Sequence, residues 1–235
     1  MTKLVITDDN SHTVFNENIG EHYHSTHGAI QESKHIFIEA GLKAAKVISN
    51  NINILEIGFG TGLNALLSYS ESEFSGVKIN YIAIEPYPIE NEIYLQLNYS
   101  EVLNNQKLKN ILTDIHQKPW NIPFYVSDNF ILNKVNAKIQ DIQLTDNVFD
   151  IVYFDAFSPQ FQPELWTEDI FRKIFNSMKN NGILTTYSSK GDVKRAMKNV
   201  GFKLELLPGP AGKRHIIRAM KIIEICSCKH NSHNH

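Results

Sequence analysis

The chain has 235 residues, of which 42% are hydrophobic and 20% are charged. These values are ordinary for a globular protein, and the length suffices for one α/β domain with a real core. The first ten residues hold no long apolar run, and no stretch is long enough to span a bilayer. Only two cysteines occur, Cys226 and Cys228, so a disulfide framework is excluded and we expect a cytoplasmic protein.

Charge is distributed unevenly along the chain. The formal net charge is −2, which taken alone argues against a general nucleic-acid binder. Residues 188–235 carry ten Lys or Arg and three Asp or Glu, a balance of +7, whereas residues 1–187 carry thirteen and twenty-two, a balance of −9. This asymmetry indicates either that the C-terminal third contacts a polyanion or that it has solvated basic faces, and charge alone does not choose between them.

The predicted elements begin with a β-rich arm over residues 1–30, where turn residues interrupt short apolar runs. In chain order, the apolar periodicities then predict a helix over residues 31–48, a strand over 53–57, a helix over 63–70, a strand over 79–85, a helix over 89–103, an irregular crossing over 104–123 and a strand over 130–139.

The second half alternates in the same way. It predicts a strand over residues 149–154, a helix over 167–178 with Thr167 as its N-cap, a strand over 183–187, a helix over 191–200 closed by Gly201, and a hairpin of strands over 202–207 and 215–223. Such alternation is typical of an α/β fold with a mostly parallel sheet. A terminal antiparallel hairpin on that sheet is the layout of the Rossmann-like class I methyltransferases that use S-adenosylmethionine (SAM), so we expect seven strands.

We therefore expect three segments. Residues 1–30 form an arm packed on a methyltransferase domain over residues 31–223, and residues 224–235 form a disordered tail. The tail holds Cys226, Cys228 and three histidines. We predict no metal site there, because these residues lie at a polar chain end without partner ligands of defined spacing.

A glycine loop gives the strongest functional signal. Residues 56–62 read Glu-Ile-Gly-Phe-Gly-Thr-Gly between a predicted strand and a predicted helix. A dinucleotide fingerprint beginning at Gly58 needs its third glycine where Leu63 stands, and a P-loop needs a Lys-Ser/Thr pair that Leu63-Asn64 does not supply. The pattern instead suits SAM, with Glu56 near the ammonium of the methionine part; the alternative is a tight turn that binds nothing.

Further acids follow the neighbouring strands. Glu85, followed by Pro86, ends the second strand at the edge where open α/β sheets bind ligands, and it is predicted to accept hydrogen bonds from ribose hydroxyls. Asp141, after the third strand, is a candidate for contact with the adenine amino group, and Asp128 is the competing choice, because the register through residues 124–141 is ambiguous. A surface turn is an equally good interpretation of both.

Asp155 ends the strand over residues 149–154 and begins an aromatic loop with Ala156, Phe157 and Pro159. Methyl transfer from a sulfonium depends mainly on positioning. An amine acceptor must also be deprotonated, because an alkylammonium has a pKa of about 10. Asp155 is therefore predicted to position the substrate or to take a proton; the alternative is a turn-forming or N-capping aspartate.

Several segments of the sequence together resemble a known protein family. The glycine loop through Asn64, the stretch Phe154–Pro159 followed by Pro163–Thr167, and the ending Gly209–Arg214 are similar to the methyltransferase domain of MnmC, as is the arm from Tyr23 to Ser33. The resemblance covers residues 11–220. It implies transfer of a methyl group from SAM to the aminomethyl group on C5 of a tRNA wobble uridine. The family is often fused to an FAD-dependent oxidoreductase, and 235 residues leave no room for one, so a stand-alone enzyme with a separate oxidoreductase partner is implied.

The resemblance also assigns residues. Those implied to bind the cofactor are Glu56, Gly58, Phe59, Gly60, Gly62, Asn64, Glu85, Pro86, Asp141, Asp155, Ala156 and Phe157. Those implied to bind the substrate are Tyr23, Ser25, Glu32, Pro159, Tyr187, Lys213 and Arg214, the last two on RNA phosphates together with Lys190, Lys194 and Arg195.

Two rival functions remain open. A polyamine-synthase-like aminopropyltransferase, or another SAM enzyme acting on a small amine, would use a similar fold and an aspartate at the position of Asp155. A SAM- or nucleoside-binding module without activity belongs to a different class, and the presence of Asp155 argues against it.

Overall fold

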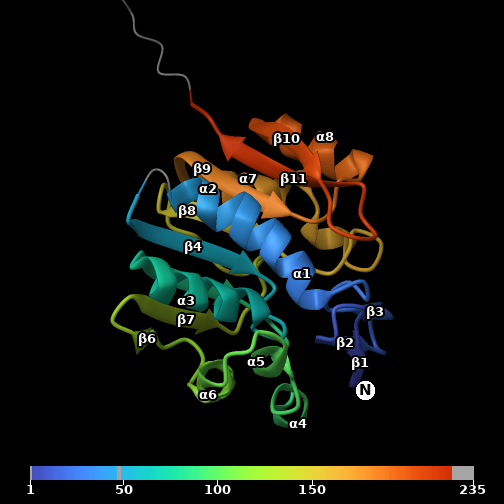
Figure 1. Ribbon diagram of the computed structural model, residues 1–235. Coiled ribbons are helices and arrows are strands. Elements are labelled where there is room, and N and C mark those ends of the chain that lie inside the picture. Colours follow the sequence, from blue (N-terminus) through green and yellow to red (C-terminus); the bar gives the residue numbers. More distant parts are fainter. Residues whose placement is uncertain (1, 47–48, 224–235) are drawn as a thin grey trace, which may run out of the picture.

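The computed structural model describes residues 2–46 and 49–223. A central sheet of eight strands has the order β10-β11-β9-β8-β4-β5-β7-β6, and a small sheet has the order β1-β2-β3 (Figure 1). The strands of the central sheet are β4 (Asn51–Ile57), β5 (Lys78–Ile84), β6 (Phe124–Ser127), β7 (Phe130–Val135), β8 (Phe149–Phe154), β9 (Met178–Thr186), β10 (Phe202–Pro208) and β11 (His215–Lys221). Of these, β6 and β11 run antiparallel to their neighbours, so the predicted mostly parallel sheet with a terminal hairpin is confirmed.

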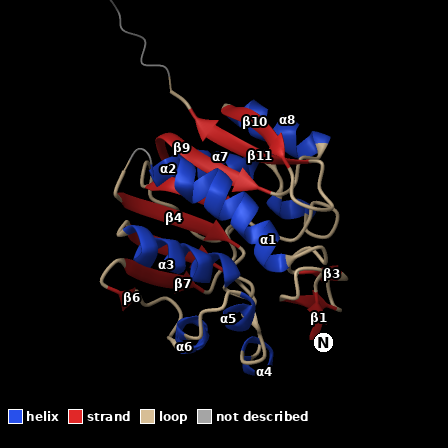
Figure 2. Ribbon diagram, viewed as in Figure 1, coloured by secondary structure: helices blue, strands red, loops and turns tan. Residues whose placement is uncertain are grey.

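Helices cover both faces of this sheet (Figure 2). Their bounds are α1 (Ala29–Ser33), the π-helix η1 (Lys34–Leu42), α2 (Lys43–Lys46), α3 (Leu63–Ser75), α4 (Asn91–Tyr94), α5 (Tyr99–Val102), α6 (Lys107–Gln117), the 3₁₀ turn η2 (Pro163–Leu165), α7 (Glu168–Ser177) and α8 (Gly191–Val200). No helix among the described residues is long and apolar enough to cross a membrane.

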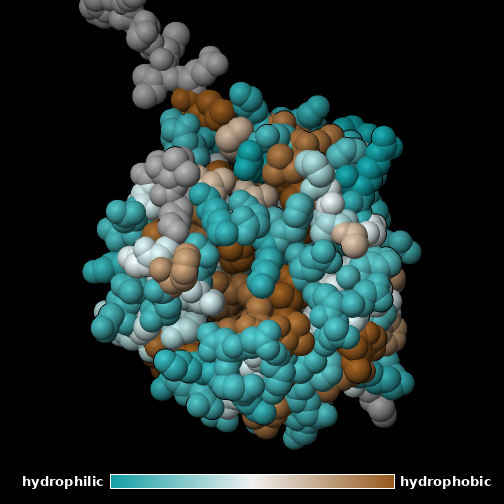
Figure 3. All heavy atoms as spheres, viewed as in Figure 1, coloured by the Kyte–Doolittle hydropathy of each residue, from teal (hydrophilic) through white to brown (hydrophobic). Residues whose placement is uncertain are grey.

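The strand β8 shows why the sheet needs a helix layer on each side. Ile151 and Tyr153 belong to the core cluster under η1 and α3, whereas Val152 and Phe154 belong to the cluster under α7 and α8. Successive side chains of a strand point to opposite faces, so the run Ile151–Phe154, which is apolar at every position, must be buried on both. The face carrying η1 and α3 is mostly hydrophilic outside, with apolar side chains gathered near its middle (Figure 3).

The prediction of seven strands was wrong, because residues 124–127 add an eighth. β6 turns back into β7 and pairs with it from Phe124↔Leu132 to Ser127↔Phe130. The strand predicted over residues 130–139 ends early, at Val135. There the side-chain amide of Asn136 donates to the carbonyls of Glu85 and Pro86 at 3.0 and 3.2 Å, and the chain leaves the sheet.

Residues 89–117 also differ from the prediction. The helix expected over residues 89–103 is two short helices, α4 and α5, and the crossing expected to be irregular contains α6. The break between α4 and α5 is a docking point, since Asn98 accepts from the backbone N–H of His12 at 2.8 Å and donates to the carbonyl of Asn10 at 2.8 Å. The prolines in this segment follow α6 and do not interrupt it, so they are compatible with the helix.

The other helix predictions are confirmed with small changes. The helix predicted over residues 31–48 begins two residues early and is a π-helix in its middle; residues 47–48 lie outside the described part of the chain. Thr167 caps α7 by accepting from the N–H of Ile170, and Gly201 closes α8 in a left-handed conformation.

The N-terminal arm contains a separate small sheet. β1 (Thr2–Ile6), β2 (His12–Asn16) and β3 (Glu21–His22) are antiparallel, and the chain then passes to α1. In Figure 1 this sheet lies beside the end of α1, away from the terminal hairpin β10–β11. The arm therefore sits next to the carboxyl ends of the central strands.

Candidate cofactor and acceptor site

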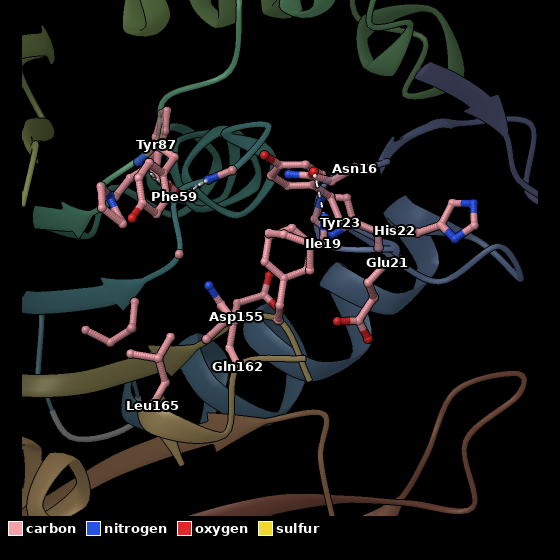
Figure 4. Close-up of a pocket in the computed structure, with 18 of the residues that line it drawn as sticks. Asn16, Ile19, Glu21, His22, Tyr23, Phe59, Tyr87, Asp155, Gln162 and Leu165 are labelled. Carbon is pink, nitrogen blue, oxygen red and sulfur yellow. Dashed lines mark hydrogen bonds between the residues drawn. The ribbon is translucent and has the colours of Figure 1, made fainter. Parts of the chain in front are cut away.

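A cavity of about 660 Å³ lies at the carboxyl edge of the sheet, between the strand ends and the N-terminal arm. Its volume is in the range of small-molecule sites. Figure 4 shows Tyr23 and Glu21 from the arm on one side and Asp155 from the end of β8 on another. The predicted site residues that line it are Tyr23, Ser25, Glu32, Gly58, Phe59, Gly60, Glu85, Pro86, Asp155, Ala156, Phe157, Tyr187 and Lys213.

The glycine loop needs its glycines for close approach. Gly58 follows β4 with φ +92°, and a Cβ there would lie 2.5 Å from the carbonyl oxygen of Asp155. Its N–H donates to the carbonyl of Ile84 at 3.0 Å, and the N–H of Asp155 donates to the carbonyl of Ile57 at 2.9 Å. At Gly60, with φ +49°, a Cβ would lie 2.8 Å from the ring of Tyr23. Any side chain at either position would push apart the segments that form the cavity.

The carboxyl groups of buried Glu56 and half-buried Asp155 share one amide beneath this loop. The side-chain nitrogen of Asn64 donates to Oε1 of Glu56 at 2.9 Å and to Oδ2 of Asp155 at 2.8 Å. Burial raises the pKa of the Glu56 carboxyl well above its ordinary value, and the charge of Asp155 raises it further. Burial, with the charge of Glu32, raises the pKa of Asp155 from 3.8 to about 7. Asn64 and Glu56 lie behind the loop and do not line the cavity, but they fix the carboxyl that does.

Glu85 lies on the other side of Gly58. Its carboxylate accepts from the N–H groups of Gly60 at 3.1 Å and Tyr87 at 2.8 Å. Burial raises its pKa to about 7, although these hydrogen bonds oppose the effect. Three carboxyl groups therefore converge on one edge of the sheet, and a positively charged ligand would offset their mutual repulsion.

The arm holds the glycine loop in place. His24 is buried and its Nε2 lies 2.9 Å from the hydroxyl of Thr61, which also accepts from Tyr99 at 3.0 Å. Burial lowers the pKa of His24 to about 4, so the ring is neutral at physiological pH. The ring of Tyr23 meets that of Phe157 edge to face, with centroids 4.9 Å apart. The sequence prediction missed the contribution of His24, for which no motif gives a signal.

The far end of the cavity is formed by four distant segments. Glu32 on α1 accepts from the N–H of Ser25 in the arm at 2.7 Å and forms an ion pair with Lys213 from the β10–β11 loop. The ammonium of Lys213 lies 5.1 Å from the centre of the Tyr187 ring, and the Tyr187 hydroxyl donates to the carbonyl of Ala156 at 2.9 Å. Lys213 therefore points into the molecule, toward carboxylates.

Several predicted residues do not line the cavity. Asp141 is exposed, and its neighbours Ile139 and Gln140 line the wall in its place. Asp128 is exposed in the turn before β7, at the opposite edge of the sheet from the site. Gly62 packs near Phe59 and His116 behind the loop, and Pro159 and Arg214 also lie outside the lining.

The residues present fit SAM. Asp155 and Glu85 line the cavity, and burial raises the pKa of both carboxyl groups to about 7. The positive charge of bound SAM, on its sulfonium and its ammonium, would stabilise their ionised forms. Glu85 is placed for ribose hydroxyls, and Gly58 and Gly60 leave room for a ligand against the backbone. Among residues 2–46 and 49–223 no group of three or more metal-ligating side chains is found; Cys226, Cys228 and the tail histidines lie outside these ranges.

Comparison with known proteins agrees with this site. Residues 99–222, more than half of the chain, match a family described as S-adenosyl-L-methionine-dependent methyltransferase. The chain belongs to this family and is a SAM-dependent methyltransferase.

A more particular likeness is to MnmC. The chain is 27% identical over 224 residues to the "tRNA 5-methylaminomethyl-2-thiouridine biosynthesis bifunctional protein MnmC" of Burkholderia multivorans, covering 91% of this chain and 34% of that protein. The crystal structure of MNMC2 from Aquifex aeolicus superposes with a TM-score of 0.76 at 25% identity, covering 95% of this chain and 71% of that one. The predicted resemblance to the MnmC methyltransferase domain is confirmed, and the chain spans about a third of the length of the curated relatives it matches.

A third comparison concerns the rival function. Spermidine synthase from Thermotoga maritima superposes with a TM-score of 0.55 at 14% identity, covering 91% of this chain and 70% of that one. At this identity the likeness shows a shared fold and says nothing about activity.

Replacing Gly58 by alanine should abolish SAM binding, because the new methyl group would meet the carbonyl of Asp155 and force the loop away from β8. Gly76→Ala is the matched control: Gly76 also has a positive φ, of +71°, but nothing lies within 4 Å of its added Cβ. Both variants carry similar backbone strain of about 1 kcal/mol. Isothermal titration with SAM should show binding for Gly76→Ala only, and equal affinities would contradict the role given to Gly58.

Asp155→Asn should stabilise the protein while abolishing methyl transfer. The carboxyl has a pKa of 3.8 in the unfolded chain and about 7 in the folded protein, so folding takes up a proton between these values and stability falls as pH rises from about 4 to 7. Asp155→Asn has no carboxyl at this position, so its free energy of unfolding does not fall with pH for this reason. Above pH 7 it should gain up to about 4 kcal/mol in unfolding free energy, at about 1.36 kcal/mol per pKa unit.

At about pH 3 and below the two proteins should be equally stable, since the carboxyl is then mostly neutral in both states. Urea unfolding between about pH 3 and 9 measures the difference, with Asp128→Asn on the exposed turn as the control that should show none. A constant difference across this range would mean that Asp155 does not titrate as described.

Proposed function

We propose that this methyltransferase acts on tRNA, converting the aminomethyl group on C5 of the wobble uridine into a methylaminomethyl group. The observation that carries the proposal is the half-buried carboxyl of Asp155, with its pKa raised to about 7, in the lining of a cavity that also contains residues of the glycine loop and the Glu32–Lys213 pair. The name of the Burkholderia multivorans relative supports the substrate, because that protein takes part in forming 5-methylaminomethyl-2-thiouridine in tRNA.

Bound SAM would supply an electrophilic methyl group on a sulfonium. The protein's part is to hold an amine in line with that methyl and to make its lone pair available. A primary alkylammonium has a pKa of about 10, so it must lose a proton first. Asp155, with a pKa near 7, is a carboxylate that accepts this proton directly or through water at neutral or slightly basic pH.

The aromatic walls of the cavity suit the rest of the acceptor. Tyr23, Phe157 and Tyr187 come from the arm and from two strand ends, and all three line the cavity. A nucleobase turned out of a tRNA loop binds such surfaces by stacking. The aminomethyl group itself would come from another enzyme, and a separate FAD-dependent oxidoreductase belongs to this proposal.

The experiment that tests the function is transfer of labelled methyl from SAM. Undermodified tRNA bearing aminomethyl-uridine should become labelled, and nucleoside analysis should place the label on the amine. The same assay with putrescine and decarboxylated SAM tests the aminopropyltransferase alternative, which predicts product from the small amine and none from tRNA. Asp155→Ala should abolish turnover; full turnover in that variant would remove Asp155 from the mechanism.

A basic surface beside the cavity is the proposed contact with RNA phosphates. β9 ends at Thr186, so Lys190 and Lys194 follow it at the same edge of the sheet as the cavity, and Arg214 adjoins the lining residue Lys213. Lys190 and Arg214 are exposed. Arg195 is already paired with Asp192 on α8, which leaves it less suited to this role than the sequence suggests.

Replacing Lys190 and Arg214 together by alanine should weaken tRNA binding and leave SAM affinity unchanged. Each lost phosphate contact lowers the slope of log K against log salt by roughly 0.7 to 0.9. Lys78→Ala/Lys203→Ala removes the same charge near the opposite edge of the sheet, where β5 and β10 begin, and should leave the slope unchanged. Filter binding at several salt concentrations measures it; equal effects of the two double variants would place the RNA elsewhere.

A further inference from the structure

The ion pair between Lys213 and Glu32 joins parts of the chain that are far apart in sequence. Both side chains line the cavity and are largely buried, with exposures of 25% and 9%. One oxygen of Glu32 is engaged by Lys213, and the other accepts from the N–H of Ser25. The pair therefore connects the β10–β11 loop, α1 and the arm at the acceptor end of the site.

The loop that carries Lys213 is shaped for this contact. The N–H of Lys213 donates to the carbonyl of Pro210 at 2.9 Å, and the N–H of Gly209 donates to the carbonyl of Arg214 at 3.1 Å. Gly212 has φ +80°, and a Cβ there would collide with the ring of His27 in the arm. The turn thus lies directly against the arm and directs Lys213 inward, while its neighbour Arg214 is exposed.

The pair is also part of the electrostatic surroundings of Asp155. The negative charge of Glu32 raises the pKa of Asp155, and the positive charge of Lys213 lowers it. The other titratable groups that interact with Asp155 are Glu56 on β4, Tyr81 on β5 and Tyr187 after β9. Of all these groups, Lys213 alone carries a positive charge, and it comes from the segment farthest along the chain.

We propose that Lys213 and Glu32 are a positioning pair for methyl transfer, which acts inside the cavity on the arm and on Asp155 and does not contact the RNA backbone. This deepens the proposed function, since it assumes that Asp155 stands at the reacting amine. The adjacent basic residues Lys213 and Arg214 then have different roles, one inside the cavity and one at the RNA backbone. Lys213 holds the Glu32 side chain in place through the ion pair, and Arg214 is exposed and left for phosphate.

Substitution of Glu32 has a predictable effect on the pKa of Asp155. Glu32→Gln removes a negative neighbour and leaves the charge of Lys213 without its partner, and both changes favour the carboxylate form of Asp155. The pKa of Asp155 should then fall by about one unit. Adding Lys213→Met removes the positive charge again, so the double variant should lie between Glu32→Gln and the wild type.

The titration of Asp155 is measured by ¹³C NMR of the side-chain carboxyl in the protein without SAM or tRNA, with Asp155→Asn identifying the resonance. This readout needs no methyl acceptor, so it stays informative if the tRNA substrate is wrong. Arg214→Met is the matched control and should leave the titration unchanged. Lys213→Arg keeps the charge and should also titrate as the wild type does, and Lys213→Gln serves in place of Lys213→Met if that variant does not fold.

The effects of these variants on tRNA binding should be the reverse of their effects on the titration of Asp155. Arg214→Met should weaken it severalfold at physiological salt, whereas Lys213→Met and Glu32→Gln should stay within about twofold of the wild type. The pH profile of methyl transfer should shift to lower pH in Glu32→Gln, which a purely structural role would not produce. The proposal is overturned if Lys213→Met weakens tRNA binding as Arg214→Met does, or if the Asp155 titration is the same in wild type, Glu32→Gln and the double variant.

Discussion

The site depends on one shared hydrogen-bond donor. The amide nitrogen of Asn64 serves both Glu56, which is buried, and Asp155, which is half-buried, beneath the glycine loop. The arrangement follows from the sheet. β4 lies between β5 and β8 in parallel register, so acids at the ends of these strands must meet. Carboxyl groups concentrated in this way are costly without a cation, and a sulfonium cofactor with an ammonium group supplies positive charge where they converge.

This constraint explains why the arm is needed. A buried carboxyl has a raised pKa only while water is kept from it, and the sheet edge alone is open to solvent. His24 and Tyr23 bring the arm down on the glycine loop through Thr61 and Gly60, and Asn98 anchors the other side of the arm. The neutral state of His24 suits this role, because a protonated ring would no longer accept a hydrogen from the Thr61 hydroxyl.

The sequence was sufficient for features that are local. The glycine loop, the acids Glu85 and Asp155 after two strands, and the caps of α7 and α8 each depend on a few neighbouring residues, and they are where they were predicted. Features that depend on distant partners were missed. The break between α4 and α5 exists because Asn98 binds the arm, and Asp141 faces solvent because the chain leaves β7 four residues earlier than its alternation suggests. No periodicity carries that information.

Lys213 and Arg214 show the same limit at the level of charge. In the sequence they are equivalent members of a basic C-terminal third, and the resemblance to MnmC implies that both contact RNA phosphates. The turn at Gly212 packs against His27, so Lys213 pairs with Glu32 whereas Arg214 is exposed. The direction of a side chain is set by the segment it packs against, so a patch of positive charge counted from sequence includes groups that are already neutralised inside. Arg218, paired with Glu205, and Lys221, bound to the carbonyl of Met178, are further examples. The basic surface that we propose for RNA is therefore smaller than the +7 of the last segment.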